Sequence, residues 1–117
     1  MSRANDIQHP IDWADFQRDE MRVGTVLAAS ENPHANKPAY VLEIDFGPFG
    51  VKTSSAQLTQ RYSAESLLGR QVVAVMNFPA KRIAGVKSEV LVLAALDEDG
   101  TTLLTLTESV QNGSRIA

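Results

Sequence analysis

The sequence contains no cysteine and no apolar run long enough to cross a bilayer. The lack of cysteine excludes disulfide bonds and thiolate metal sites. The start, MSRANDIQHPIDWADF, also lacks the apolar stretch of a secretory signal peptide. We therefore expect a soluble, cytoplasmic protein that does not insert into membranes. With 117 residues, 44% of them hydrophobic, the chain can bury the core of one ordinary domain.

Residues that commonly carry catalysis are scarce. The two histidines, His9 and His34, are far apart in the chain, and no third metal ligand stands at a recognisable spacing. No Gly-rich phosphate loop follows a predicted strand, and no set of nucleophile, base and orienting group can be assembled. We therefore expect a protein with no metal, no cofactor and no enzymatic activity.

The charge is unevenly distributed along the chain, although the formal net charge is only −3. Residues 1–20 carry two basic and five acidic side chains, and residues 97–117 carry one basic and four acidic ones. The middle, residues 21–96, carries eight basic and five acidic side chains. This asymmetry indicates a basic face on an acidic body, with a mixed solvated surface as the alternative.

Runs of β-branched residues and alternating apolar residues predict a mostly β protein. In one strand, Tyr40, Leu42, Ile44 and Phe46 share an apolar face. Gly24 predicts a bend or bulge of the kind that curls a sheet into a barrel. The strands that we expect cover residues 21–29, 39–46, 51–55, 72–75, 90–96 and 102–107.

Short helical segments separate some of these strands. Residues 10–18 predict a helix capped by Asp12, with Trp13 and Phe16 on one apolar face. That face is expected to dock on one end of the sheet or on a second subunit. Ser54 and Gln57 have capping-box spacing for a helical turn, and a second turn at residues 63–68 should end at Gly69.

This order of elements predicts an all-β, five-stranded OB-fold barrel. Its short helices lie between the third and fourth strands and at the N-terminus, and a C-terminal extension follows the barrel. A sandwich is the alternative, but the helix position and Gly24 favour the barrel. We expect an N-terminal extension with a short helix at 1–20 and an OB-fold domain with a C-terminal dimerisation segment at 21–117.

The most informative stretch is a polar loop at 77–89 between two apolar runs. Pro79 should end the first run near Phe78, and Gly85 allows a sharp turn. The loop presents Lys81, Arg82 and Lys87 close together at one rim of the sheet. Two stiff strands that hold a basic loop indicate a recognition surface.

Each candidate residue has a functional and a structural interpretation. The loop cations, extended by Lys52 and Arg61, are expected either to contact RNA phosphates or simply to keep the surface soluble. Phe78 could stack on a base, line an apolar peptide pocket or pack in the core. Hydrogen bonds to bases or to a peptide backbone, or alternatively to strand-end backbone groups, are expected from Ser54, Ser55, Asn77 and Ser88.

These segments together resemble the tRNA-binding domain family, and within it the free-standing secretion chaperones of the CsaA type. The resemblance spans nearly the whole chain and includes the OB-fold module appended to methionyl-tRNA synthetase. It rests on MRVGTV at 21–26, IDFG at 44–47, SSAQLT at 54–59, NFPAKRIAGVKSEVLVL at 77–93 and Asn112-Gly113.

The resemblance implies a homodimer that binds macromolecules without chemistry. Unfolded or precursor polypeptides are the implied ligands of a CsaA-type chaperone, and tRNA or structured RNA is the alternative. Trp13, Phe16 and the C-terminal strand are the implied dimer interface. Two departures from the family pattern are Ala80 in place of a second proline and Val86 in place of a Phe. The family's HPxADK-like motif is also reduced, which puts RNA contacts from that loop in doubt.

Overall fold

A computed structural model describes residues 7–117; residues 1–6 of the predicted N-terminal extension lie outside the described part. The elements are α1 (Trp13–Gln17), β1 (Met21–Glu31), β2 (Tyr40–Asp45), η2 (Gly47–Phe49), β3 (Val51–Ala56), α2 (Ala64–Leu67), β4 (Gln71–Val75), β5 (Lys81–Ile83), β6 (Val86–Ser88), β7 (Leu91–Val92), β8 (Ala94–Asp97) and β9 (Gly100–Leu103).

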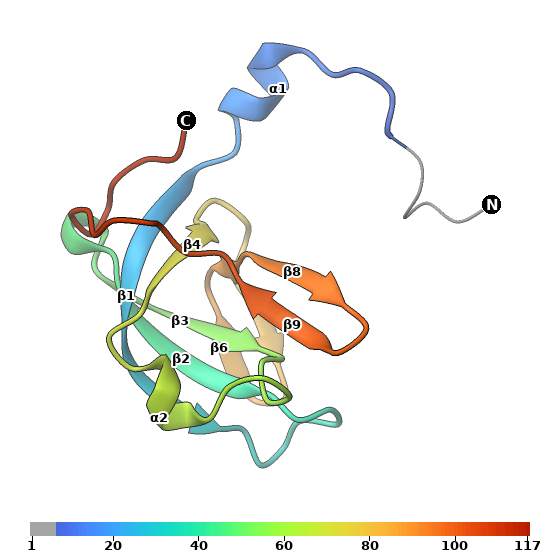
Figure 1. Cartoon of the computed structure of the whole chain (residues 1–117), viewed down its shortest axis with the longest axis vertical. Helices are drawn as coiled ribbons and strands as arrows, with labels where there is room; N and C mark the ends of the chain where they lie inside the picture. The colour runs from blue at the N-terminus through green and yellow to red at the C-terminus, as the bar shows by residue number, and fades with distance from the viewer. Residues whose placement is uncertain (1–6) are drawn as a thin grey trace.

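Five antiparallel strands form a nearly closed barrel in the order β3-β2-β1-β4-β7 (Figure 1). Two small hairpins, β5–β6 and β8–β9, are attached to it. The helix α2 lies between β3 and β4, begins at the N-cap Ser63 and is followed by Gly69 with a φ of +81°. This arrangement confirms the predicted OB-fold and the position of its helix.

The core lies inside the barrel and follows the alternation of the strands. Tyr40, Leu42, Ile44 and Phe46 are all buried, as their shared face predicted. Leu58 and Leu67 cover one end of the barrel from the segment between β3 and β4. The same core cluster also contains Val26, Val72, Ala74 and Val90.

Three details of the predicted strands and helical turns were wrong. Residues 90–96 are not one strand, because β7 (Leu91–Val92) pairs with β4, whereas β8 (Ala94–Asp97) leaves the barrel sheet and pairs with β9. The last strand ends at Leu103 rather than at residue 107. Ser54 caps no helix, because β3 continues to Ala56 and Ser54 pairs with Leu42.

Gly24 serves close packing rather than a bulge. The register of β1 shifts between Val26 and Ala28, so the bulge lies further along the strand. A Cβ on Gly24 would come within 2.6 Å of Ile44 Cγ2 and 2.7 Å of the Phe46 ring. The missing side chain therefore lets β1 lie directly against the core residues of β2.

The helix α1 stands apart from the barrel and buries no residue of its own (Figure 1). Its Trp13 is 74% exposed and stacks on Phe16, with ring centroids 5.8 Å apart. The expectation that this face packs on its own sheet was therefore wrong. No helix in residues 7–117 is long and apolar enough to cross a membrane.

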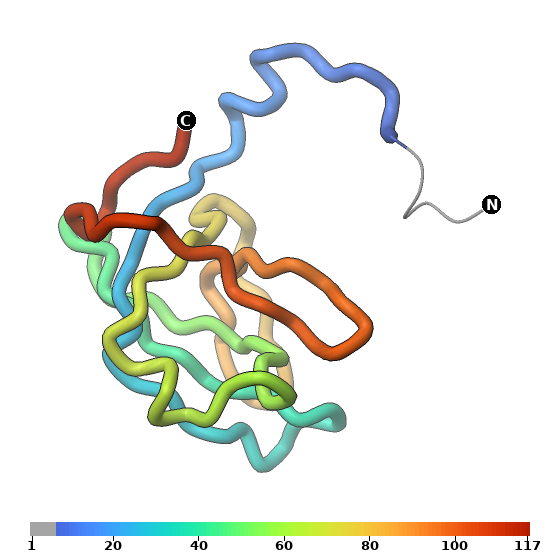
Figure 2. The backbone as a smooth tube through the Cα atoms, in the orientation of Figure 1, coloured from blue at the N-terminus to red at the C-terminus, as the bar shows by residue number. Residues whose placement is uncertain are grey.

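The C-terminal segment runs along the start of β1, as the red and light-blue parts of the tube show (Figure 2). The N–H of Gly113 donates to Val23 O over 2.7 Å, and that of Ile116 donates to Met21 O over 3.0 Å. The end of the chain thereby covers backbone groups of β1 that would otherwise form a free edge.

We predict that Gly24→Ala destabilises the fold by about 1–3 kcal/mol, since the new methyl group overpacks the contact with Ile44 and Phe46. Urea unfolding measures the change. Ser30→Ala, at an exposed position of the same strand, is the control and should change stability by less than about 0.5 kcal/mol. Equal stabilities of the two variants would contradict this account of Gly24.

Candidate functional site

The predicted basic loop is a two-stranded hairpin in the structure. β5 and β6 pair antiparallel, and the two residues that join them, Ala84 and Gly85, have φ values of +47° and +84°. Positive φ at both central residues is the type I′ geometry that suits a two-residue hairpin. The side chain of Asn32 steadies the tip, because its Nδ2 donates to Ala84 O over 3.4 Å.

The hairpin is attached to the edge of β3 by Ser88, the last residue of β6, and by Glu89, which follows it. The N–H of Glu89 donates to Thr53 O over 2.8 Å, and Thr53 N–H donates back to Glu89 Oε1 over 3.3 Å. Ser55 N–H donates to Ser88 Oγ over 3.0 Å. Ser88 and Glu89 thus complete hydrogen bonds at the β3 edge where the barrel lacks a neighbouring strand.

The side chains of the hairpin divide between its two faces. Lys81 lies opposite Ser88, Arg82 opposite Lys87, and Ile83 opposite Val86. Because side chains alternate along a strand, Lys81 and Ile83 share one face, while Arg82 and Lys87 share the other. The three predicted cations are therefore near one another in the fold but do not form a single patch.

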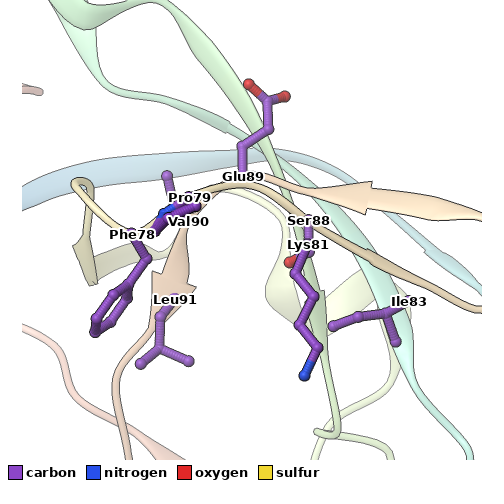
Figure 3. Close-up of a pocket in the computed structure, with 8 residues that line it drawn as sticks. All are labelled: Phe78, Pro79, Lys81, Ile83, Ser88, Glu89, Val90 and Leu91. Carbon is purple, nitrogen blue, oxygen red and sulfur yellow. The ribbon is translucent and has the colours of Figure 1, made fainter.

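The face that carries Lys81 and Ile83 borders a pocket of about 190 Å³. Phe78, Leu91, Lys81 and Ile83 point toward the same side, whereas the carboxylate of Glu89 points away (Figure 3). Phe78 is 55% exposed and Leu91 is 50% exposed. The remaining lining residues are Pro79, Ser88 and Val90.

Of the predicted basic residues, two form ion pairs with carboxylates and three do not in residues 7–117. Lys52 Nζ lies 3.9 Å from Glu89 Oε2, and Arg61 Nη2 lies 3.4 Å from Asp97 Oδ2. Within residues 7–117, by contrast, no carboxylate pairs with any of the three hairpin cations. Arg61 also borders Gly100 of the β8–β9 hairpin and does not extend the β5–β6 surface.

Several predicted polar contacts serve the fold. Ser54 is only 1% exposed, and its hydroxyl donates to Ser55 O over 3.3 Å. Asn77 accepts from Glu20 N–H over 3.0 Å and donates to Arg18 O over 2.7 Å, which ties the segment before β1 to the end of β4. Asn77 thereby matches the structural alternative, satisfaction of strand-end backbone groups, whereas Ser54 is buried within β3.

Sequence reasoning missed the apolar half of the site. Ile83 and Leu91 did not enter the list of candidates, although both are large apolar residues beside a polar loop. For Ile83 the available signal was its position two residues after Lys81, because residues two apart lie on the same face of a strand. In residues 7–117 no group of His, Asp and Glu side chains is arranged to hold a metal ion.

Comparison with known proteins identifies the class. The model of the tRNA binding domain family matches residues 21–115, so the chain belongs to this family. Together with the barrel, the match defines a non-catalytic binding module of OB-fold architecture.

Particular relatives fall into two groups. Solved structures of the chaperone CsaA from Bacillus anthracis and from Picrophilus torridus superpose with TM-scores of 0.89 and 0.87, at 47% and 43% identity. They cover 93% and 92% of this chain and 100% of their own. The methionine–tRNA ligase of Pyrococcus horikoshii is 32% identical over 106 residues, which are 91% of this chain. This chain spans only 14% of that ligase's length.

We predict that Ala84→Asn stabilises the protein by up to about 1 kcal/mol, because Ala at this φ is strained and Asn tolerates left-handed backbone. Thermal and urea unfolding measure the gain. Ala80→Asn, at an exposed position just before β5, is the control and should give no gain. A loss of stability in Ala84→Asn would contradict the type I′ assignment.

Proposed function

We propose that this protein is a CsaA-like chaperone that captures unfolded or precursor polypeptides for export. The observation that carries the proposal is the open apolar pocket beside β5, where Phe78, Ile83 and Leu91 remain exposed. Exposed apolar surface that is gathered around a hollow is typical of a binding site. The similar structures from B. anthracis and P. torridus, both of CsaA chaperones, support the proposal.

The size of the pocket suits a chain rather than a small molecule. Its volume of about 190 Å³ is below the roughly 300–1,000 Å³ typical of sites for drug-sized ligands. It has room for an apolar side chain of an extended polypeptide. Lys81 at the rim adds attraction for a carboxylate or a backbone carbonyl. One such contact is weak, so useful affinity requires several sites on one client.

A second copy of the chain would supply the additional site. We propose that the protein is a homodimer and that α1 forms part of the interface. Trp13 and Phe16 line a groove with the C-terminal residues Arg115 and Ile116, and Trp13 stays 74% exposed in the single chain. Aromatic residues are enriched in the buried centres of interfaces. A partner on this groove would cover them.

RNA binding is the second candidate function. The specific observations that favour it are the family match over residues 21–115 and the hairpin cations without carboxylate partners in the described part of the chain. Under this proposal the protein acts as a free-standing tRNA-binding module, alone or with a synthetase. Its affinity for RNA would fall as salt is added.

We predict that Phe78→Ala weakens binding of a reduced, alkylated polypeptide by roughly tenfold, about 1.4 kcal/mol, because the ring is the largest apolar part of the pocket wall. Fluorescence anisotropy of the labelled polypeptide measures the affinity. Leu96→Ala is the control, since Leu96 is 88% exposed and does not line this pocket. An unchanged affinity in Phe78→Ala would exclude the pocket as the capture site.

We predict that Trp13→Ala converts the dimer to monomer at micromolar concentration, because it removes the largest apolar side chain of α1. Sedimentation equilibrium measures the mass, with Leu68→Ala as the control, since Leu68 is 50% exposed at the end of α2 and outside the proposed interface. Two results would refute this interface: a wild-type protein with the mass of one chain, or a Trp13→Ala variant with the mass of two.

A further inference from the structure

Two cations face each other on the side of the β5–β6 hairpin that does not border the pocket. Arg82 and Lys87 are directly opposite in the register, and both are exposed. Like charges at directly opposite positions of an antiparallel pair repel and destabilise it. A hairpin that places them there keeps a local positive charge that an external anion would neutralise.

The protein itself supplies no such anion in residues 7–117. The three ion pairs found there join Glu20 to Arg22, Lys52 to Glu89 and Arg61 to Asp97. The only hydrogen bond from the Arg82 side chain in this part of the chain runs from Nη1 to Gly85 O, over 3.1 Å. This bond holds the guanidinium beside the turn and leaves the other donors of the group for a ligand.

The composition of this face selects the class of anion. Of the six strand residues, four lie on the pocket face, and the opposite face carries only Arg82 and Lys87. An acidic polypeptide would find no apolar side chain of the hairpin here. A phosphodiester backbone needs none, because it binds through charge and hydrogen bonds alone. The guanidinium fork suits two oxygens of one phosphate, and the ammonium suits a point contact with the same or the next one.

We propose that Arg82 and Lys87 form a phosphate-binding pair for an RNA backbone and that Lys81 is not part of it. The proposal rests on the second candidate function, RNA binding, and assigns it to the hairpin face opposite the polypeptide pocket. RNA and polypeptide therefore bind to different faces of one hairpin, and substitutions separate the two activities.

The test compares two lysines on the same hairpin. Lys87→Gln and Lys81→Gln each remove one positive charge, from opposite faces. Affinity for a labelled tRNA transcript is measured by filter binding over a series of KCl concentrations. Log K falls as log salt rises, and Lys87→Gln should reduce the steepness of this fall by about 1. Arg82→Gln with Lys87→Gln should reduce it by about 2. The slope of Lys81→Gln should stay near that of the wild type.

Polypeptide binding provides the second readout, with the reduced, alkylated polypeptide as the probe. The variant carrying both Arg82→Gln and Lys87→Gln should bind it as the wild type does, because neither residue lines the pocket. Urea unfolding checks that the variant is folded, which the exposure of both side chains leads us to expect.

Three results would overturn the proposal. The first is an equal drop in salt slope for Lys81→Gln and Lys87→Gln. The second is a loss of polypeptide binding with RNA binding retained in the double variant, which would make the pair a site for acidic peptides. The third is a folded wild-type protein that binds no tRNA even at low salt; in that case polypeptide capture stands or fails separately, on the Phe78→Ala measurement.

Discussion

The exchange of hydrogen bonds between Glu89 and Thr53 fixes the relation between the barrel and its hairpin. β5 and β6 belong to no ladder of the five-stranded sheet. Their attachment depends on Glu89, on the Ser88 hydroxyl that accepts from Ser55 N–H, and on Asn32 at the tip. These contacts satisfy the β3 edge and at the same time orient the hairpin. The same hydrogen bonds therefore cover the free edge of β3 and hold the hairpin that carries the candidate site.

Strand alternation converts this fixed hairpin into two chemically different surfaces. With the register set by the Lys81–Ser88 pairing, odd-numbered residues of β5 meet the apolar pocket and Arg82 meets Lys87. A slip of one residue would exchange the faces and place Arg82 at the pocket. The short type I′ turn resists such a slip, because its two residues leave no slack between the strands. Register thus decides which ligand chemistry each face can offer.

The sequence predicted what depends on local pattern. The alternation in 40–46 predicted the buried face of β2, and Gly69 marked the end of α2. β4 ends at Val75, before the position near Phe78 that Pro79 predicted. The order of strands and helix was enough for the OB-fold.

Contacts between distant segments could not be predicted in the same way. The hairpin within 77–89 was missed because its Ala84-Gly85 turn lacks the Asn or Asp that usually marks such turns. Ser54 resembled a helix cap because of its spacing from Gln57. Its actual burial depends on the pairing of β2 with β3, which this local pattern does not show. The division of residues 90–96 into β7 and β8 depends on which distant strand each part pairs with, β4 for β7 and β9 for β8.

The claim that the two faces bind different ligands is tested most directly by side-chain NMR on one labelled sample. The Ile83 methyl signals report on the pocket face, and the Arg82 Nε–Hε signal reports on the other. Our account predicts that an unfolded polypeptide shifts the Ile83 signals and leaves Arg82 unchanged, and that a tRNA transcript does the reverse. Shifts of both signals by the same ligand, saturating together, would contradict it.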